Sequence, residues 1–311
     1  MSIERKSKLS RRAFLKQVGA GAAAMVATQL LSAPVLASEG LNEETETPGM
    51  LIDLTRCIGC NSCALACKET NHLPGDSDEP LTSFSSDTYT FVDTRQTTTA
   101  DGETIEHYVK RQCMHCLDPA CVSACPAAAM YKSDEGPVIY RAERCLGCRY
   151  CQMGCPFGVP SFEWKNGITP VISKCWLCYP RLQKGQEPAC AEACPTGALR
   201  FGWRDHLLAE AHAQIISNPG RYVDHIFGEF EVGGTSMLYL SDIPFAELGF
   251  PANLPQTAPP EETEKIMSKL PAVIAGMTVL MAGTAIVTHR HKPLESIQDN
   301  EELTSTDGQE E

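Results

Sequence analysis

Short apolar stretches, separated by polar, glycine and proline residues, are the main pattern along the middle of the chain, and each is typical of a short strand. We expect strands at 50–54, 138–140, 199–201 and 235–240, and a hairpin formed by 89–92 and 105–110 around Asp101-Gly102. Leu208, Ala211 and Ile215 recur at helical spacing. They predict a helix that Asp205 caps and that ends near Ser217, before Asn218-Pro219-Gly220. The pattern therefore indicates an α+β domain built from small elements.

A longer apolar run, 270–288, lies near the C-terminus and contains 19 residues without a charge. At about 1.5 Å per helical residue, this length matches the hydrocarbon core of a bilayer, so we expect one transmembrane helix. A buried or interfacial helix is the alternative. His289-Arg290-His291-Lys292 follows the run and favours a cytoplasmic C-terminus, although Lys265 and Lys269 on the other side weaken that orientation.

The N-terminus has the features of an export signal. Ser10-Arg11-Arg12-Ala13-Phe14-Leu15-Lys16 precedes a weakly apolar run at 18–36, and Val35-Leu36-Ala37 is a cleavage-like site. This combination is typical of a twin-arginine signal peptide over 1–37, with a basic membrane-anchoring start as the alternative. Such export moves folded proteins, so we expect the domain on the periplasmic face of the cytoplasmic membrane, single-pass, with its C-terminus in the cytoplasm.

These features divide the chain of 311 residues into six parts. They are a signal peptide (1–37), an acidic linker (38–49), a globular domain (50–250), a tether rich in proline and glutamate (251–269), the transmembrane helix (270–288) and an acidic cytoplasmic tail (289–311). With 43% hydrophobic and 21% charged residues, the chain is neither wholly disordered nor a multi-pass membrane protein. Its net charge of −13 argues against binding to nucleic acid.

The sixteen cysteines carry the strongest chemical signal, because they fall into four blocks of four. The first block is Cys57, Cys60, Cys63 and Cys67; the second is Cys113, Cys116, Cys121 and Cys125; the third is Cys145, Cys148, Cys151 and Cys155; the fourth is Cys175, Cys178, Cys190 and Cys194. Blocks one and three have the spacing C-x2-C-x2-C-x3-C. In blocks two and four the gap between the second and third cysteines is longer, with four and eleven residues. Proline follows the last cysteine in three blocks (Pro126, Pro156, Pro195), whereas Lys68 follows block one.

This spacing and the Cys-Pro pairs are typical of bacterial [4Fe–4S] ferredoxins, in which the fourth cysteine binds the other cluster of a pair. Disulfides do not require triplets at two-residue spacing. Zinc ribbons leave the middle cysteine of each triplet unexplained, and covalent haem needs a C-x-x-C-H motif that the chain lacks. The cysteines therefore predict iron as the only metal, held in four [4Fe–4S] clusters.

Several stretches resemble a known family. The block order resembles the four-cluster electron-transfer subunits of membrane-bound respiratory oxidoreductases, and more specifically the HybA-type iron–sulfur subunits of periplasmic nickel–iron hydrogenase-2. The stretches that carry the closer likeness are Lys110-Arg111-Gln112-Cys113-Met114-His115-Cys116, Cys145-Leu146-Gly147-Cys148-Arg149-Tyr150-Cys151, Gly233-Gly234-Thr235 and Ile243-Pro244. The resemblance covers about residues 49–290 and implies two tandem ferredoxin-like units in one globular domain.

The resemblance also implies which cysteines share a cluster. The first cluster would use Cys57, Cys60, Cys63 and Cys194; the second Cys67, Cys175, Cys178 and Cys190; the third Cys113, Cys116, Cys121 and Cys155; the fourth Cys125, Cys145, Cys148 and Cys151. Blocks two and three would then form one unit, and the flanking blocks one and four the other. Spacing alone supports this crosswise pairing without proving it.

We find no catalytic motif in the sequence, neither a nucleophile elbow nor a phosphate-binding or dinucleotide-binding loop. The resemblance implies a non-catalytic electron-transfer subunit. On one side it would contact a hydrogenase, made of a small and a large subunit, and on the other an integral, quinone-reactive membrane subunit. Two alternatives remain open. One is the same role for a molybdenum or tungsten enzyme of the formate dehydrogenase or polysulfide, sulfite or nitrate reductase type. The other is an anchoring or assembly protein with structural clusters.

Overall fold

The computed structural model describes residues 47–74, 82–98, 101–164 and 171–289. The predicted signal peptide, most of the acidic linker and the tail beyond His289 lie outside these ranges.

A three-stranded sheet forms the core of the domain, with β1 (Pro48–Asp53) at its centre. On one side β1 pairs antiparallel with β8 (Leu199–Trp203), and on the other it pairs parallel with β9 (Met237–Leu240). Every residue of β1 is buried, because its two faces meet different parts of the core. Leu51 faces one apolar cluster and Met50 faces another that contains several cysteines. The predicted strands at 50–54, 199–201 and 235–240 are confirmed.

Helix α7 (Arg204–Ser217) covers the Leu51 face of this sheet, with Leu207 and Ala211 as its buried residues. It ends where the sequence predicted, and Asn218 is its C-cap. The prediction that Asp205 caps the helix is wrong. Trp203 occupies the N-cap position, and Asp205 lies in the first turn, where its carboxylate is 3.6 Å from the guanidinium of Arg204.

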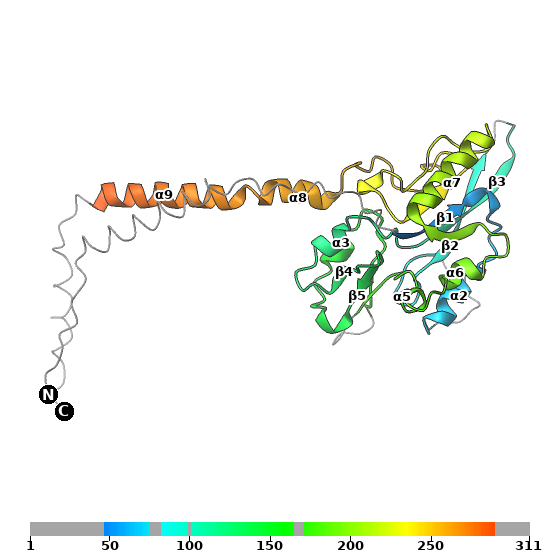
Figure 1. Cartoon of the computed structure of the whole chain (residues 1–311), viewed down its shortest axis with the longest axis horizontal. Helices are drawn as coiled ribbons and strands as arrows, with labels where there is room; N and C mark the ends of the chain where they lie inside the picture. The colour runs from blue at the N-terminus through cyan, green and yellow to red at the C-terminus, as the bar shows by residue number, and fades with distance from the viewer. Residues whose placement is uncertain (1–46, 75–81, 99–100, 165–170, 290–311) are drawn as a thin grey trace, which may run out of the picture. The chain divides into compact units, whose positions relative to one another are not determined.

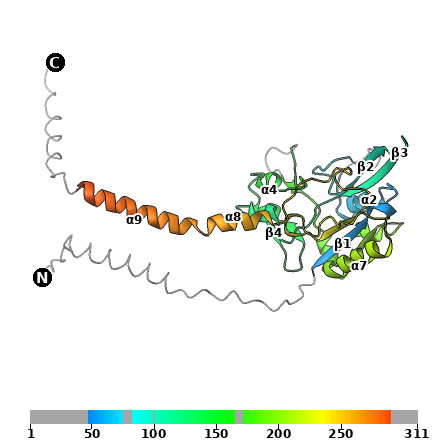
Figure 2. The ribbon, with the colours of Figure 1, turned by 90° about the horizontal axis from the view of Figure 1, so that it is seen from above.

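The remaining elements form two groups, which we call the inner module (113–173) and the outer module (47–112 and 174–258). The inner module contains α3 (Ala120–Ser123), the β4–β5 hairpin (Met130–Lys132, Val138–Tyr140), η2 (Ala142–Arg144), α4 (Tyr150–Met153) and the short β6–β7 pair (Ser161–Phe162, Ile172–Ser173). Figures 1 and 2 both place α3 or α4 beside β4, apart from α2, β2 and α7. The predicted strand at 138–140 is confirmed as β5.

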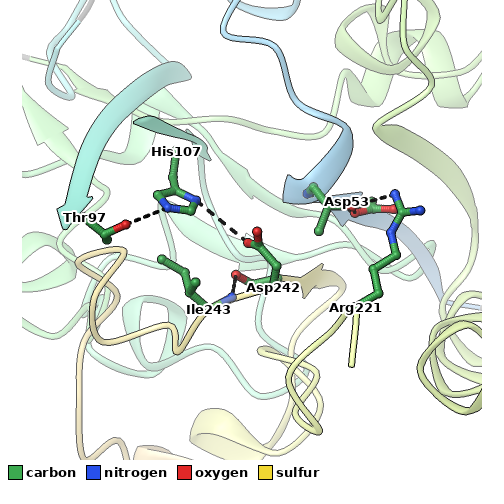
Figure 3. A network of polar contacts seen from close by, with 8 residues as sticks. Asp53, Thr97, His107, Arg221, Asp242 and Ile243 are labelled. Atoms are coloured by element: carbon green, nitrogen blue, oxygen red, sulfur yellow. Dashed lines mark hydrogen bonds and ion pairs between the residues drawn. The ribbon is translucent and has the colours of Figure 1, made fainter. Parts of the chain in front are cut away.

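The outer module adds several elements to the sheet. They are η1 (Leu54–Arg56), α2 (Ser62–Thr70), the predicted hairpin as β2 (Phe91–Thr98) and β3 (Thr104–Arg111), α5 (Tyr179–Leu182), α6 (Ala189–Glu192) and η3 (Glu231–Gly233). His107 on β3 connects the hairpin to the loop that follows β9. Its Nε2 is 2.9 Å from Oγ1 of Thr97, and its Nδ1 is 3.8 Å from Oδ1 of Asp242, as Figure 3 shows.

The segment predicted as a solvated tether is partly packed and partly helical. Backbone N–H groups of Val232 and Gly233 donate to the carbonyls of Pro255 and Gln256 at 2.7 and 2.8 Å, and Ala258 is fully buried. Proline at the first helical positions then starts α8 (Pro259–Met267), which contacts α3. Helix α9 (Leu270–His289) follows. The stretch Pro259–Ala285, which includes α8 and most of α9, is long and apolar enough to cross a membrane, and the described side chains of α9 are exposed.

Candidate metal centre

All sixteen cysteines lie in the described residues, and no two of them are joined by a disulfide bond there. Their positions follow the helix contacts of the two modules. Helix α2 of block one packs against α6 of block four, and α3 of block two packs against α4 of block three. The chain thus brings blocks one and four together in the outer module, and blocks two and three together in the inner module.

In the outer module, two cavities are each lined by four cysteines. Cys57, Cys60, Cys63 and Cys194 line the first. Cys67, Cys175, Cys178 and Cys190 line the second. These are the two sets that the resemblance implies for this half of the chain, and each contains cysteines from block one and block four.

In the inner module, the other two implied sets can be recognised because neighbouring thiols raise the pKa of one another. Burial raises the pKa of Cys116, and so do the nearby thiols of Cys113, Cys155 and Cys121. Burial likewise raises the pKa of Cys151 to about 11, with further contributions from Cys125, Cys145 and Cys148. Both groups mix block two with block three. Cys175 and Cys113 are also within electrostatic reach of each other, so the two modules adjoin at their cysteines.

The first C-x-x-C loop of every block has the same backbone turn. The residue before its second cysteine has a positive φ in all four: Gly59 (71°), His115 (47°), Gly147 (67°) and Leu177 (57°). Glycine adopts this conformation without strain, whereas His115 and Leu177 do so at a steric cost. The turn directs backbone N–H groups at sulfur: Gly147 N lies 3.4 Å from Cys145 Sγ, and Leu177 N lies 3.4 Å from Cys175 Sγ.

The Cys-Pro pairs form a second repeated turn. After Cys125, Cys155 and Cys194, the residue three positions on has a positive φ and donates its N–H to the cysteine carbonyl, at 3.1–3.3 Å. Block one differs because Lys68, unlike proline, can remain inside a helix. Helix α2 therefore runs past Cys67 to Thr70.

Burial makes these thiols unfavourable places for negative charge. It raises the pKa of Cys67 and Cys121 to about 12, and that of Cys63 to about 11. The pKa of Cys194 is lowered, because hydrogen bonds from Thr196 and from the backbone outweigh its burial. Metal-bound cysteine must be a thiolate, and four thiolates gathered in one set, some of them buried, require cations among them. Iron in a cluster would supply that charge.

In the outer module, each set of four cysteines lines a cavity. Cysteines that hold a cluster surround it and bind its separate corners. The two cavities therefore have the ligand arrangement that a cluster requires.

His115 gives a second test of the fit. It is completely buried, and burial lowers the pKa of its imidazole well below the usual value, so the ring is neutral. Its Nδ1 accepts a hydrogen bond from the N–H of Val138 at 3.0 Å, which leaves the hydrogen on Nε2. Nε2 has no partner among the described residues. A buried donor inside a C-x-x-C loop fits a cluster sulfur as its acceptor.

Two cysteines, Cys60 and Cys148, are exposed, and they belong to different modules. They hold equivalent places in blocks one and three. In each block the residue two positions earlier is an exposed apolar side chain, Ile58 or Leu146, with 59% and 72% of its surface accessible. The other cysteines are buried or half-buried. The site thus approaches solvent at one place in each module.

Sequence reasoning missed some polar residues that surround the cysteines. Lys110 was quoted only as part of a motif, yet it is buried and lines the first cavity. Gln112, quoted only in the same motif, lines the second cavity together with Asn71 and Thr90, which the sequence analysis did not name. The lysine lies in a strand and the asparagine just after a helix, and nothing in the local pattern distinguishes them from exposed polar residues.

Comparison with known proteins indicates the same kind of cofactor. Two matches to family models described as 4Fe-4S dicluster domain cover residues 49–126 and 105–204. A protein of Nitratidesulfovibrio vulgaris is 40% identical over 298 residues, which cover 92% of this chain and 79% of the relative. The hydrogenase-2 operon protein HybA of Escherichia coli O157:H7 is 34% identical over 314 residues, with 88% and 95% covered.

The nitrate-inducible formate dehydrogenase iron–sulfur subunit of Escherichia coli K12 is also similar. It is 33% identical over 269 residues, which cover 81% of this chain and 88% of that subunit. Taken together, the dicluster matches, the sixteen cysteines and these relatives establish four [4Fe–4S] clusters as the cofactors.

Proposed function

Because the chain belongs to the family of iron–sulfur electron-transfer subunits that includes HybA and the formate dehydrogenase iron–sulfur subunits, we propose that it connects a periplasmic [NiFe] hydrogenase to a quinone-reactive membrane subunit. When bound, the clusters take up and release single electrons. The observation that carries the proposal is that each cysteine set lies within electrostatic reach of the next, from the set with the exposed Cys60 to the set with the exposed Cys148.

We assign the ligands as the resemblance implies. In the outer module, Cys57, Cys60, Cys63 and Cys194 hold one cluster, and Cys67, Cys175, Cys178 and Cys190 hold the next. In the inner module, Cys113, Cys116, Cys121 and Cys155 hold the third, and Cys125, Cys145, Cys148 and Cys151 the fourth. The two cavities and the thiol neighbours support this assignment. Electrostatic contacts also connect successive sets, from Cys63 to Cys190, from Cys175 to Cys113 and from Cys121 to Cys151.

The two exposed ends would face different partners. Helix α8 contacts α3, which carries Cys121, so the helix that leads toward α9 starts beside the inner module. We therefore place the Cys148 end toward the membrane subunit and the Cys60 end toward the catalytic subunit. Cys148 is flanked by the exposed side chains of Leu146, Tyr150 and Met153, which offer apolar surface for a partner.

Export and anchoring complete the proposal. The signal at 1–37 would deliver the folded domain to the periplasm, and α9 would cross the membrane once, with the residues after His289 in the cytoplasm. The length and apolar composition of α9 support the crossing, and the basic residues that follow it support the orientation.

The alternative catalytic partner is a molybdenum or tungsten enzyme, since the formate dehydrogenase subunits are relatives too. The combination of a twin-arginine signal with a C-terminal helix favours the hydrogenase. The deciding experiment is the metal content of the native complex, solubilised gently and purified through a tag after Glu311. We expect nickel in a stoichiometric amount. Molybdenum or tungsten without nickel would replace the hydrogenase by the alternative partner.

The same preparation tests the electron-transfer role against an anchoring or assembly role. Hydrogen should reduce the clusters in the wild-type complex, and removal of this subunit should abolish the passage of electrons to quinone. An unchanged rate without the subunit, or clusters that do not respond to dithionite, would contradict the proposal.

A further inference from the structure

Lys110 places an ammonium group inside the outer module. Its side chain is 1% exposed, and Nζ donates hydrogen bonds to Oγ1 of Thr90, at 2.8 Å, and to Oε1 of Gln112. Both acceptors are uncharged. Among the ion pairs of the described residues, none involves Lys110. A buried ammonium without a counter-charge is strongly unfavourable, so this part of the core must contain negative charge from another source.

The surroundings of Lys110 identify that source. The lysine lines the first cavity together with Cys57, Cys63 and Cys194. Its two hydrogen-bond partners, Thr90 and Gln112, line the second cavity. The ammonium group therefore lies in the wall between the two four-cysteine sites of the outer module.

The electrostatics agree with this placement. Burial by itself would lower the pKa of Lys110, but the charges that Cys190 and Cys63 would carry raise it above the usual lysine value. The group therefore remains protonated. Its charge in turn favours the thiolate form of four cysteines. Cys57 and Cys63 line the first cavity, and Cys67 and Cys178 line the second.

We propose that Lys110 is a counter-charge shared by the two clusters of the outer module, a positioning residue that raises the reduction potential of both together. The inference rests on the cluster assignment proposed above. A cluster with four thiolates is negatively charged, and reduction adds one more negative charge. A fixed cation in a low-dielectric wall stabilises the reduced form, and it weakens the repulsion between two reduced neighbours.

The test is an electron paramagnetic resonance redox titration of the full chain in its solubilised complex. We compare the wild type with Lys110→Met, which removes the charge, and with Lys110→Arg, which keeps it. Lys184→Met serves as the control, because Lys184 is an exposed cation in the same module. We expect two of the four midpoint potentials to fall in Lys110→Met, with little change in Lys110→Arg and none in Lys184→Met. In a Cys194→Ser background, which lacks one outer cluster, Lys110→Met should shift only one midpoint potential.

The outcomes separate this proposal from the assignment on which it rests. A fully loaded Lys110→Met chain with all four potentials unchanged would overturn the role of Lys110 and leave the relay intact. If Lys110→Met loses clusters, the cluster content of Lys110→Arg decides. Four clusters in Lys110→Arg support a requirement for the positive charge. A similar loss of clusters shows that the shape of the lysine side chain matters, and it overturns the proposal. A wild-type chain with far fewer than about sixteen iron atoms, four for each cluster, would overturn both.

Discussion

The side-chain amide of Asn71 donates a hydrogen bond to the sulfur of Cys67, with Nδ2 and Sγ 3.5 Å apart. The same nitrogen lies 2.8 Å from the carbonyl oxygen of Cys67, and the indole N–H of Trp176 donates to Oδ1 of Asn71. Trp176 lies inside the first C-x-x-C loop of block four. A donor next to a block-one sulfur is therefore oriented by a residue of block four.

Replacing this donor should lower a reduction potential. In Asn71→Leu the Cys67 sulfur loses a hydrogen bond that becomes stronger as the cluster gains negative charge. A hydrogen bond contributes about 1 kcal/mol, which for a one-electron couple corresponds to a fall of at most roughly 40 mV. We expect one of the four potentials to fall by this order in a redox titration, and a smaller fall in the same direction for Trp176→Phe.

Asn218→Leu is a matched control for this change. Asn218 is also the C-cap of a helix, and its Nδ2 also donates to the carbonyl four residues back, that of Gln214, at 2.9 Å. The control loses the same kind of cap but touches no cysteine. If both variants shift a potential equally, or if neither does, the bond from Asn71 to Cys67 has no role in tuning.

Cys194→Ser should remove the cluster held with block one and leave the inner module loaded. Cys194 lines the first cavity with three block-one cysteines, whereas the inner sets contain no residue of block four. Iron content and electron paramagnetic resonance spectra measure the loss. Cys155→Ser, at the equivalent Cys-Pro position of block three, should remove an inner cluster instead. Loss of the inner signals in Cys194→Ser would refute the crosswise pairing.

The cysteine spacing predicted the chemistry of the site, and the short apolar runs predicted most of the strands. Both are local signals. The resemblance implied the crosswise sharing, but the reason for it is not local: α2 can pack on α6 only because β8 returns to pair with β1. The burial of Lys110 could not be predicted from local sequence either. Its ammonium group bonds to Thr90 and Gln112, and these two residues line a cavity formed by cysteines that are distant in the sequence.

The end of the domain was harder to predict, because proline and glutamate suggest a solvated linker. The structure buries Ala258 against Gly233, where a side-chain carbon would come within 2.8 Å of the Ala258 Cβ. This contact could not be foreseen, since the Gly233-Gly234 pair was known only as part of a resemblance. It fixes the point at which α8 leaves the domain.

Gly233→Ala should therefore loosen the start of α8. Gly233 has a φ of +85°, so alanine brings both a backbone cost and an overlap with Ala258. We expect a loss of about 2–4 kcal/mol in the free energy of unfolding, together with faster tryptic cleavage at Lys265. Chemical denaturation and limited proteolysis measure the two effects.

Gly185→Ala separates the two costs. Gly185 has a φ of +70°, and no atom lies within 4 Å of the position its side-chain carbon would take. We expect a loss of only about 1–2 kcal/mol, with no change in cleavage at Lys265. Equal effects of the two substitutions would show that the packing of Ala258 adds nothing.

Truncation after Ser268 tests the role of α9. The described side chains of α9 are exposed, so its removal uncovers no part of the domain. When the chain is expressed without its partners, the truncated form should leave the membrane fraction and keep its full iron content. A chain ending at Lys292 retains α9 and should stay in the membrane after an alkaline wash. A truncated chain that still resists the wash would argue against α9 as the anchor.

The central place of β1 in the sheet has a consequence for how the protein is made. A ribosome releases all eight inner cysteines once residue 155 has emerged, whereas β1 must wait for β8 at Leu199 and β9 at Met237 before its two edges are paired. Such distant pairing is slow compared with local folding. Contacts within the inner module, such as those of α3 with α4 and of β4 with β5, can therefore form first, whereas the loop around His115 is completed only when the segment at 234–237 bonds to it. The outer module closes only after β9 (Met237–Leu240) has been synthesised, so a shorter nascent chain cannot present the complete set of cysteine sites.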